Sequence, residues 1–345
     1  MHKLKLAVIG GGFTSQTCHL PCLKQNTNVK IVALAEKRKE LRDKVAKKFN
    51  IKNKYKNHVD LLNSEKILDL VVVITRRSET HDVVKYCLNK GVNVFSEKPM
   101  SYSLKGAKIL FNLSKKKKCF YQIGFNKLYD KGIIKGKIIF EKYIKSKKFG
   151  KFSYFKFQRF SGSGYVPNIK FIKTKDKYSL KKKSLKNYPN FLIKSNFSLY
   201  DTYLNLYSHN ISLLNFFFKK IPKVINFINK NNFQITTLDY KSFYGTLETT
   251  FKKDFEWNEK LELYFENGKL EIRTYPQQKK NAPASVTIKK RGKTVKNIQI
   301  KPQSWSFQNQ INSIISKVKN KNFAKNNAKE CIDDHILIEK IFKKL

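Results

Sequence analysis

The chain is short of acidic residues, of cysteine and of long apolar runs. Asp and Glu number 25 against 72 Lys and Arg, so the formal net charge of the 345 residues is +47. The five cysteines are an odd number scattered through a large chain, which favours reduced thiols over a disulfide framework. No apolar run approaches the roughly 18 residues that span a bilayer, and no signal-peptide core follows Met1. We therefore expect a cytoplasmic protein that does not enter a membrane.

Arginine is also sparse, and this bears on whether the positive charge serves nucleic acid. Nucleic-acid-binding proteins usually concentrate arginine and lysine on one face, because the planar guanidinium binds phosphate and guanine through two hydrogen bonds. Here the cations are nearly all lysine and are spread along the whole chain, with only short runs at 115–118 and 181–183. We expect no nucleic-acid partner, although a field of this size attracts anionic substrates and polyanions nonspecifically.

Cys18, His19 and Cys22 are close enough in sequence to suggest a metal site. Two thiols four residues apart on a helix more often pack against the core than bind a metal. We therefore expect no metal.

The first third of the chain alternates apolar strands with helices. The segment 68–74 is apolar at nearly every position, as in a strand that is buried on both faces of a sheet. Strands separated by helices imply a parallel sheet, and Pro21 is expected to end the first helix early. The predicted strands are 4–9, 29–35, 68–74, 92–95 and 119–124, and the predicted helices are 14–24, 39–49, 81–89 and 104–114. The fold class is α/β, with a doubly wound parallel sheet over residues 1–125.

After Asn126 the pattern becomes that of an antiparallel sheet. The dipeptides 267–268 (Asn-Gly) and 291–292 (Arg-Gly) each separate two alternating segments, which predicts hairpins. The predicted strands are 152–160, 243–251, 261–265, 270–275, 286–290 and 294–300, and the predicted helices are 132–144, 305–319 and 328–342. The segment 161–189 predicts a long loop, which is either a lid or binding loop or an idle excursion. We expect a second, α+β domain over residues 126–345 with a large, mostly antiparallel open sheet.

The first predicted strand runs directly into three glycines and a helix start. Gly10 and Gly12 occupy the first two glycine positions of a dinucleotide-binding fingerprint, and Ser15 stands at the third. In this geometry main-chain N–H groups and the helix dipole bind a pyrophosphate. The coenzyme is therefore expected against Gly10, Gly12, Phe13 and Thr14, although a strand-to-helix turn needs glycine in any case.

An acidic residue ends the second predicted strand. Glu36 lies about 24 positions beyond Gly12, where a carboxylate accepts the adenosine ribose hydroxyls of NAD. The alternative is that Glu36 only caps the next helix. Lys37 and Arg38 follow at once and are suited to a 2′-phosphate, so NAD is favoured and NADP stays open.

A lysine stands at the end of another buried strand. The strand 92–95 leads to Glu97, Lys98 and Pro99, at the edge where open α/β sheets bind ligands. We expect Glu97 and Lys98 at the coenzyme, and the alternative is a surface lysine in a chain full of lysine. Further coenzyme contacts are expected near other strand ends and at the domain crossing, from Thr75, Arg76, His81 and Asn126.

Five segments resemble, in order and spacing, the Gfo/Idh/MocA oxidoreductases. They are 8–12 (Val-Ile-Gly-Gly-Gly), 19–21 (His-Leu-Pro), 74–81, 95–99 (Phe-Ser-Glu-Lys-Pro) and 124–127 (Gly-Phe-Asn-Lys). The resemblance implies an N-terminal NAD(P)-binding Rossmann domain and a C-terminal domain whose sheet carries the substrate pocket and often an oligomer interface. It also implies that Lys98 approaches both the nicotinamide and the substrate, and that the protein is a homo-oligomer acting on a sugar, cyclitol or nucleotide sugar.

The family's second catalytic signature is a helix with an aspartate and, four residues later, a histidine. Asn205 and His209 stand at those positions, so an amide replaces the carboxylate. Residues four apart share one face of an α-helix, and an amide orients an imidazole but supplies no counter-charge. The resemblance implies that His209 is the general acid/base, that Lys98 stabilises the alkoxide and that Asn205 orients the ring. The alternative for His209 is a satisfied histidine on an apolar helix.

Substrate contacts are expected from the strand 152–160 and the loop after it, through Arg159 and Tyr165. Arg159 suits a carboxylate or phosphate, including that of a nucleotide sugar. The leading hypothesis is an NAD(P)-dependent dehydrogenase or reductase acting on CH–OH groups, with a redox-assisted hydrolase or lyase as a variant. The alternatives are a catalytically silent coenzyme-binding sensor, which Asn205 keeps open, and nucleic-acid association through the positive field.

Overall fold

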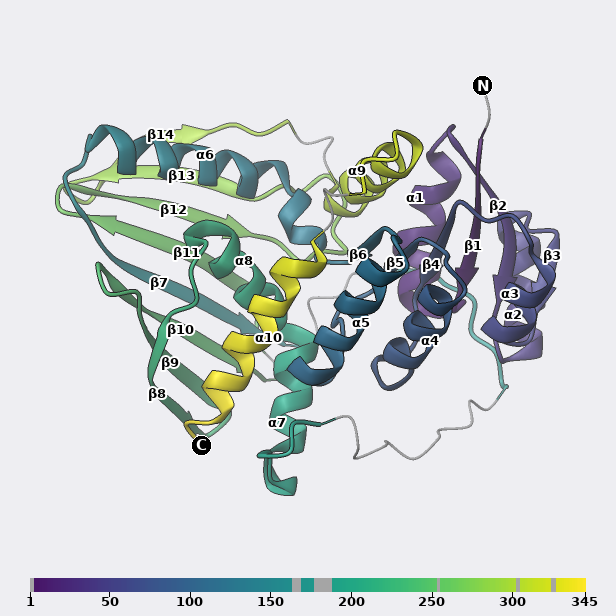
Figure 1. Ribbon diagram of the computed structural model, residues 1–345. Helices are drawn as coiled ribbons and strands as arrows, with labels where there is room; N and C mark the ends of the chain where they lie inside the picture. Colours follow the sequence, from purple (N-terminus) through teal and green to yellow (C-terminus); the bar gives the residue numbers. More distant parts are fainter. Residues whose placement is uncertain (1–2, 163–168, 177–187, 253–254, 302–304, 324–326) are drawn as a thin grey trace. The chain divides into compact units, whose positions relative to one another are not determined.

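The structure of the protein is a computed structural model, and it describes residues 3–162, 169–176, 188–252, 255–301, 305–323 and 327–345. The chain forms two compact units, each built on its own sheet (Figure 1). Unit 1 comprises Met1–Gly124, Ile169–Asn190 and Gln310–His335, and unit 2 comprises Phe125–Asn168, Phe191–Asn309 and Ile336–Leu345.

Unit 1 contains a six-stranded sheet in the order β3-β2-β1-β4-β5-β6, and every neighbouring pair is parallel. The bounds are β1 Leu4–Ile9, β2 Val29–Ala35, β3 Asn53–Tyr55, β4 Leu70–Val73, β5 Val94–Ser96 and β6 Tyr121–Ile123. The direction of the strand order changes between β1 and β4, and open α/β sheets bind their ligands beside such a point. The predicted doubly wound parallel sheet is confirmed.

The sequence of β4 shows why these residues form a parallel sheet. All four of its side chains, Leu-Val-Val-Val, are buried, as they must be in a strand whose sheet is covered by crossover helices on both faces. The helices that connect the strands of unit 1 include α2 Lys39–Phe49, α3 His58–Ser64, α4 Arg77–Asn89 and α5 Leu104–Lys116. β3 and α3 were not predicted. β3 is three residues long and has no apolar run.

The first helix continues through Pro21, so the expectation that proline ends it early was wrong. A π-helical turn, η1 Ser15–His19, precedes α1 Leu20–Gln25, and Pro21 lies in the first turn of α1. Proline is tolerated in a first turn because its missing N–H is not needed there. The wider π turn shifts the hydrogen-bond register immediately before it.

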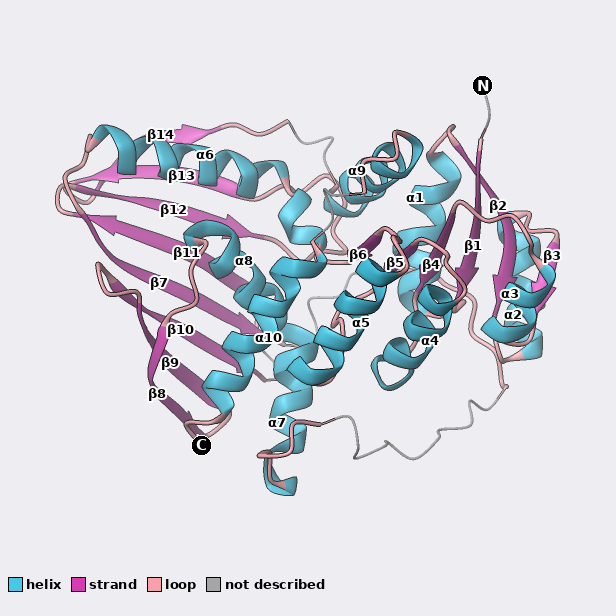
Figure 2. Ribbon diagram, viewed as in Figure 1, coloured by secondary structure: helices cyan, strands magenta, loops and turns pink. Residues whose placement is uncertain are grey.

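Unit 2 contains an eight-stranded sheet in the order β14-β13-β12-β11-β7-β10-β9-β8 (Figure 2). Its neighbouring strands are antiparallel except for β7 and β10, which are parallel. The bounds are β7 Phe152–Ser161, β8 Lys223–Lys230, β9 Phe233–Asp239, β10 Tyr244–Phe251, β11 Asn258–Phe265, β12 Gly268–Thr274, β13 Ser285–Lys290 and β14 Lys293–Ile298. The predicted large, mostly antiparallel sheet is confirmed.

The remaining helices lie in the second half of the chain. They are the 3₁₀ turns η2 Asn126–Tyr129 and η5 Lys194–Asn196, the π turn η6 Tyr203–Tyr207, and α6 Lys131–Ser146, α7 Phe197–Thr202, α8 Ser208–Phe218, α9 Ser306–Lys319 and α10 Ala328–Phe342. Gly136 lets α6 pack closely on the sheet, since a Cβ there would lie 2.4 Å from Cδ1 of Ile272 in β12. Phe140 of α6 meets Phe152 of β7 edge-on, with 5.0 Å between the ring centroids.

The hairpin of β8 and β9 was not predicted. Its turn consists of Asn231 and Asn232, whose φ angles are 53° and 66°. Two positive φ angles in succession characterise a type I′ turn, which asparagine adopts more readily than most residues. An Asn-Asn pair between alternating segments is therefore a hairpin signal that a search for glycine-containing turns overlooks.

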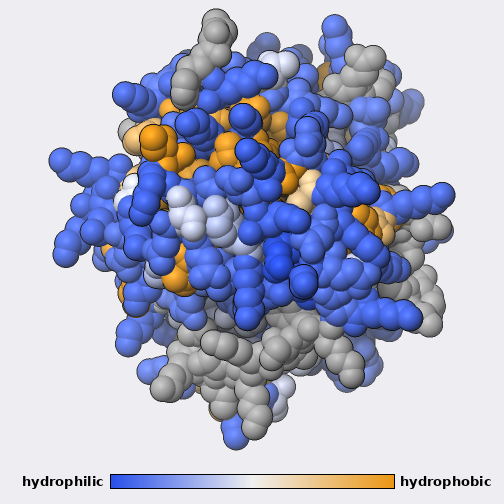
Figure 3. Space-filling model, turned by 90° about the vertical axis from the view of Figure 1, so that its right-hand side faces the viewer, coloured by the Kyte–Doolittle hydropathy of each residue, from blue (hydrophilic) through white to orange (hydrophobic). Residues whose placement is uncertain are grey.

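The surface drawn in Figure 3 is mostly hydrophilic, with smaller apolar areas among the polar side chains. All five cysteines lie among the described residues, are buried and form no disulfide bond. Within the described ranges, no helix combines the length and the apolar composition that crossing a membrane requires. In the same ranges, no three His, Cys, Asp or Glu side chains gather as a metal site would need.

Candidate active site

The glycine turn after β1 has no room for a side chain at its first position. Gly10 has a φ of +103°, and a Cβ there would lie 2.1 Å from the carbonyl oxygen of Ile74. Gly12 is open by contrast, since the nearest atom to its Cβ position is Nη2 of Arg38 at 4.0 Å. Gly10 therefore serves the fold, and Gly12 leaves a space beside the backbone that a ligand can approach.

Glu36 ties the end of β2 to this turn. Its carboxylate accepts hydrogen bonds from the N–H of Gly11 (2.9 Å) and from the N–H, Nε and Nη2 of Arg38 (3.1, 2.9 and 3.0 Å). Burial raises the pKa of Glu36, but these hydrogen bonds outweigh it and lower the pKa below its ordinary value. Helix α2 begins after Arg38 without a side-chain cap, so Glu36 holds the turn and Arg38 rather than capping the helix.

Glu97 is held in place by a histidine from the first helix. Nε2 of His19, which is fully buried, lies 2.7 Å from Oε1 of Glu97, and the N–H of Lys98 donates to Oε2 at 3.2 Å. The Lys98–Pro99 peptide bond is cis. No pattern in the sequence pairs His19 with Glu97, because the two residues are 78 positions apart and meet only through the sheet order.

The residues after β4 lie at the same edge of the sheet. Oγ1 of Thr75 is 3.0 Å from Oγ1 of Thr80, and Arg76 is the N-cap residue of α4 in extended conformation. His81 lies farther along α4, with Nδ1 3.3 Å from Oγ of Ser101, and burial lowers its pKa. Thr75 and Arg76 thus lie where a ligand at the strand ends would pass, whereas His81 packs against the residues after β5.

A strap, residues 169–176, fastens onto the glycine turn within unit 1. The side-chain amide of Gln16 donates to the carbonyl oxygens of Gly11 (2.9 Å) and Ile172 (3.2 Å) and accepts from the N–H of Ile172 (2.8 Å). Phe13 and Phe171 pack edge to face, 5.0 Å between centroids. Asp176 then accepts a hydrogen bond from the N–H of Glu40, in the first turn of α2 (2.8 Å). The strap is the described central part of the predicted loop 161–189, and it links the glycine turn to the start of α2.

His209 and Asn205 lie in unit 2 on consecutive helical turns. His209 belongs to α8, is buried and meets the ring of Phe125 edge-on at 5.6 Å. Asn205 lies in the π turn η6, and Asp201 lies before it in α7. Residues four apart share a face in a regular α-helix, and the π turn breaks that regularity between Asn205 and His209, so the spacing does not place them on one face. Lys98 belongs to the other unit, and its convergence with His209 on one substrate oxygen stays a prediction.

Arg159 belongs to a buried cluster of charges in unit 2. Glu259, on β11, pairs with Nζ of Lys127 and lies 3.4 Å from Nη1 of Arg159, and Asn210 donates to it at 2.8 Å. Oγ1 of Thr274 also donates to this carboxylate. Burial raises the pKa of Glu259, but the charges of Lys127 and Arg159 outweigh it and lower the pKa to about 2. The carboxylate of Glu259 therefore stays ionised at neutral pH.

Lys127 and Glu259 are functional candidates that were not predicted from the sequence. Burial lowers the pKa of Lys127 to about 8, against the attraction of Glu259. Lys127 stands within the segment 124–127 that carried the family resemblance, which was the available signal. No sequence signal marked Glu259, because its burial follows only from the pairing of β11 with β7.

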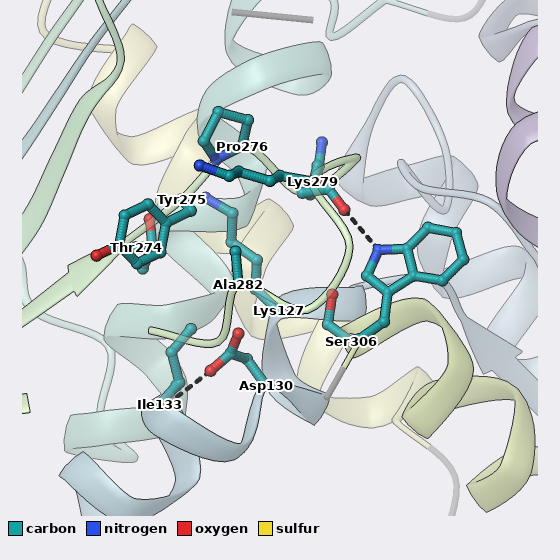
Figure 4. A pocket seen from close by; sticks show the side chains of 11 residues that line it. Lys127, Asp130, Ile133, Thr274, Tyr275, Pro276, Lys279, Ala282 and Ser306 are labelled. Atoms are coloured by element: carbon teal, nitrogen blue, oxygen red, sulfur yellow. Dashed lines mark hydrogen bonds between the residues drawn. The ribbon is translucent and has the colours of Figure 1, made fainter. Parts of the chain in front are cut away.

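A pocket in unit 2 adjoins this cluster (Figure 4). Two of its lining residues, Lys127 and Thr274, bond to Glu259. The pocket is lined by Lys127, Asp130, Ile133, Thr274, Tyr275, Pro276, Gln277, Lys279, Ala282, Trp305 and Ser306. Asn126 supports one wall by donating from Nδ2 to Oγ of Ser306 (2.8 Å). Tyr165, the other predicted substrate residue, lies outside the described residues.

The strand order, the glycine turn after β1 and the acidic residue at the end of β2 define unit 1 as a dinucleotide-binding Rossmann fold. Residues 4–125 match the model of the oxidoreductase family with an NAD-binding Rossmann fold, GFO_IDH_MocA. This domain therefore matches the Gfo/Idh/MocA oxidoreductase family, and the resemblance noted in the motifs is confirmed.

Two curated relatives match part of the chain. An uncharacterized oxidoreductase of Schizosaccharomyces pombe is 30% identical over 131 residues, which are 38% of this chain and 36% of that protein. A second uncharacterized oxidoreductase of the same organism is 28% identical over 142 residues, 41% of this chain and 39% of that protein. The match therefore spans little more than a third of either relative.

Solved structures resemble the chain over almost its whole length. KijD10, a 3-ketoreductase from Actinomadura kijaniata in complex with NADP and TDP-benzene, has a TM-score of 0.77 at 12% identity and covers 99% of this chain and 98% of its own. The dehydrogenase MviM from Clostridium difficile has a TM-score of 0.73 at 18% identity, with 99% of both chains covered. At these identities the likeness shows the fold alone.

Proposed function

We propose that this protein is an NAD(P)-dependent dehydrogenase or reductase that acts on a CH–OH or carbonyl carbon of a sugar, cyclitol or nucleotide sugar. The observation that carries the proposal is the glycine turn, where backbone fills the space at Gly10 and leaves the space at Gly12 open. A pyrophosphate needs this close approach to main-chain N–H groups at a helix start. A nicotinamide coenzyme, when bound, supplies or accepts the hydride.

The coenzyme's two ends would meet different residues. Gly10, Gly12, Phe13 and Thr14 would hold the pyrophosphate, and Glu36 would accept the adenosine ribose hydroxyls. The nicotinamide half would lie along Thr75, Arg76, His81, Glu97, Lys98 and Asn126. The carboxylate of Glu36, whose pKa its hydrogen bonds lower, already pairs with Arg38 and would repel a 2′-phosphate, so we propose NAD as the coenzyme.

The chemistry then requires one proton transfer and a stabilised alkoxide. We assign the proton to the imidazole of His209 and the stabilisation of the alkoxide to the ammonium of Lys98, with Asn205 orienting the imidazole. Arg159 and Tyr165 would contact the rest of the substrate. KijD10, a structural neighbour, is a 3-ketoreductase solved with TDP-benzene and NADP, and for this reason nucleotide sugars belong among the candidate substrates.

The test is to follow the near-ultraviolet absorbance of NADH and NADPH against a panel of nucleotide sugars, inositols and aldoses. Lys98→Ala and His209→Ala should each lower kcat by about 100-fold or more, because each removes a group that acts on the reacting oxygen. Lys115→Ala, on the exposed end of α5, is the matched control and should leave kcat unchanged. Activity that survives both active-site changes would contradict the assignment.

A catalytically silent sensor is the second candidate function, because Asn205 replaces the family's aspartate. It would bind NAD or NADP tightly by calorimetry and turn over no member of the panel. Restoring the carboxylate with Asn205→Asp should then create or raise turnover if the fold is otherwise competent, and it should leave coenzyme affinity unchanged.

We also propose that the protein is a homo-oligomer through the outer face of the sheet in unit 2. Tyr154, Tyr244 and Ile235 lie on this face; Tyr244 is 58% exposed and Ile235 41% exposed. Light scattering during size-exclusion chromatography would give the mass of the assembly. A monomeric mass that does not change with protein concentration would contradict the proposal.

A further inference from the structure

Arg159 is one of the largest side chains that unit 2 buries completely, and its exposed fraction is 0%. It projects from β7 on the face that elsewhere carries Phe155 and Phe157, since alternate residues of a strand share a face. Its guanidinium lies 4.5 Å from the centroid of the Trp257 ring. A charged group buried among apolar residues needs partners for all its donors, because unmade hydrogen bonds there cost free energy.

Among the described residues, only one edge of this guanidinium has a hydrogen-bond partner. Nη1 meets Glu259 at 3.4 Å, whereas Nε and Nη2 are buried and have no hydrogen-bond partner among the described residues. The N–H groups of Nε and Nη2 point in parallel along one side of the planar group. This side is the fork that binds the two oxygens of a carboxylate or phosphate.

Two further observations point to the same kind of ligand. Oγ of Ser161, two residues farther along the same face of β7, is also buried and has no hydrogen-bond partner among the described residues. Within the cluster two cations, Lys127 and Arg159, share the carboxylate of Glu259, and Asp130 on the pocket wall also attracts Lys127. An anion would satisfy the open donors of Arg159 and the hydroxyl of Ser161. The pocket of Figure 4 reaches the cluster through Lys127 and Thr274.

We propose that Arg159 is the specificity-determining residue of the substrate site and binds an anionic group, a carboxylate or phosphate, on the sugar. The inference rests on the proposed function of this site and adds the class of substrate to it. A neutral sugar would leave the fork of Arg159 unpaired, so the enzyme would discriminate strongly in favour of sugar acids or sugar phosphates.

Trp257 offers a direct readout of binding that needs no turnover. The chain has two tryptophans, of which Trp257 stacks on Arg159 and Trp305 lines the adjoining pocket, so the emission of the unaltered protein reports on both. We would titrate the unaltered protein with glucuronate, with glucose 6-phosphate and with neutral glucose at an ionic strength of about 0.15 M, to screen nonspecific attraction. A saturable change in emission with glucuronate or glucose 6-phosphate, but not with glucose, is expected. The two anions distinguish a carboxylate from a phosphate.

Variants at Arg159 test whether this residue binds the anion. Arg159→Gln should weaken binding about 100-fold, because two charge-assisted hydrogen bonds are lost. Arg159→Lys keeps the charge without the fork and should weaken it about tenfold. Arg273→Gln, a partly exposed arginine on β12, is the matched control and should change the Kd by less than about twofold. If Arg159→Gln does not fold, the Kd of the folded Arg159→Lys variant still tests whether Arg159 binds the anion.

Two results would overturn the inference. One is that neither anion gives a saturable change, and the other is that Arg159→Lys binds as tightly as the parent. A measurement of turnover distinguishes failure of the anion site from failure of the proposed function. Arg159-dependent anion binding without turnover of any sugar would end the proposed function and leave the anion site standing. Turnover of a neutral sugar with a KM that Arg159→Lys leaves unchanged would end the inference and leave the function standing.

Discussion

The two sheets of this protein bury different chemistry. The central strand β4 of unit 1 buries four apolar side chains, and the glycine turn proposed to hold a pyrophosphate there offers main-chain groups. The sheet of unit 2 buries Arg159 and Glu259 on adjacent strands. A backbone site needs small residues and an exact turn, and therefore suits a constant ligand such as a coenzyme. A side-chain site varies with each substitution, and therefore suits a substrate that differs between relatives.

A large effect is expected in unit 1. Gly10→Ala should lower the free energy of unfolding by about 3 kcal/mol or more, because its Cβ would overlap the carbonyl oxygen of Ile74 at a φ that alanine disfavours. Gly91→Ala also changes a glycine of positive φ, but nothing lies within 4 Å of its Cβ position. It should cost about 1 kcal/mol in the same urea titration. Equal losses at the two positions would contradict the close approach at Gly10.

Glu259→Gln tests the buried charges of unit 2. It should lower the free energy of unfolding by about 3–5 kcal/mol, because Lys127 and Arg159 lose their shared carboxylate. The pKa of Glu259 is about 2 in the folded protein against an ordinary 4.5. Its stabilisation is therefore complete above about pH 4.5 and is lost as the pH falls towards 2.

Urea titrations across this pH range would show the dependence, and Glu259→Gln should flatten it. The matched control is Glu248→Gln on the outer face, where the side chain is 19% exposed and pairs with Lys156. If both variants lose the same stability, burial of the charge does not decide the outcome.

Gln16→Ala should loosen the strap on the glycine turn. The change removes three hydrogen bonds of the Gln16 amide, two of which bind Ile172. Hydrogen exchange at the Ile172 amide should reflect a local opening that is easier by about 1–3 kcal/mol. If the coenzyme lies beneath the strap, its dissociation should also be faster. Thr17→Ala, which loses contacts to the carbonyl oxygen of Phe13 and to Sγ of Cys18 but none of the Gln16 hydrogen bonds to the strap, should leave this exchange unchanged.

The smallest effect is expected on the outer face of unit 2. Lys156 pairs with Glu248 at 3.1 Å, but its side chain is 35% exposed. Lys156→Ala should therefore change the free energy of unfolding by less than about 0.5 kcal/mol, since water screens exposed ion pairs. A loss comparable to that of Glu259→Gln would show that the two faces of β7 do not differ as described.

Much of the fold could be predicted because its strands are either continuously apolar or strictly alternating. β4 is apolar at every position, and β7 alternates buried and more exposed side chains; few structures other than strands show these patterns. The prediction failed where the signal was short or of another kind, as in β3 and the Asn231-Asn232 turn. It also failed at Pro21, where the π turn that accommodates proline has no pattern in the sequence.

The candidate site divides in the same way. The positions of Gly10 and Glu36 follow from local order along the chain, since a strand, a turn and a helix are consecutive. The contact of Arg159 with Glu259, 100 positions later, follows from the register of β7 against β11. The contact of His19 with Glu97 likewise depends on the order of strands in unit 1.

The amino-acid sequence by itself determined the fold class, the family resemblance and the residue types at the proposed site, because these depend on patterns within a few consecutive residues. Only the tertiary structure decided that Glu36 binds Arg38 and the glycine turn, that Lys127 and Glu259 are buried together and that one edge of Arg159 has no hydrogen-bond partner among the described residues. The reason is that burial and pairing depend on which distant segments meet, and no single segment carries that information.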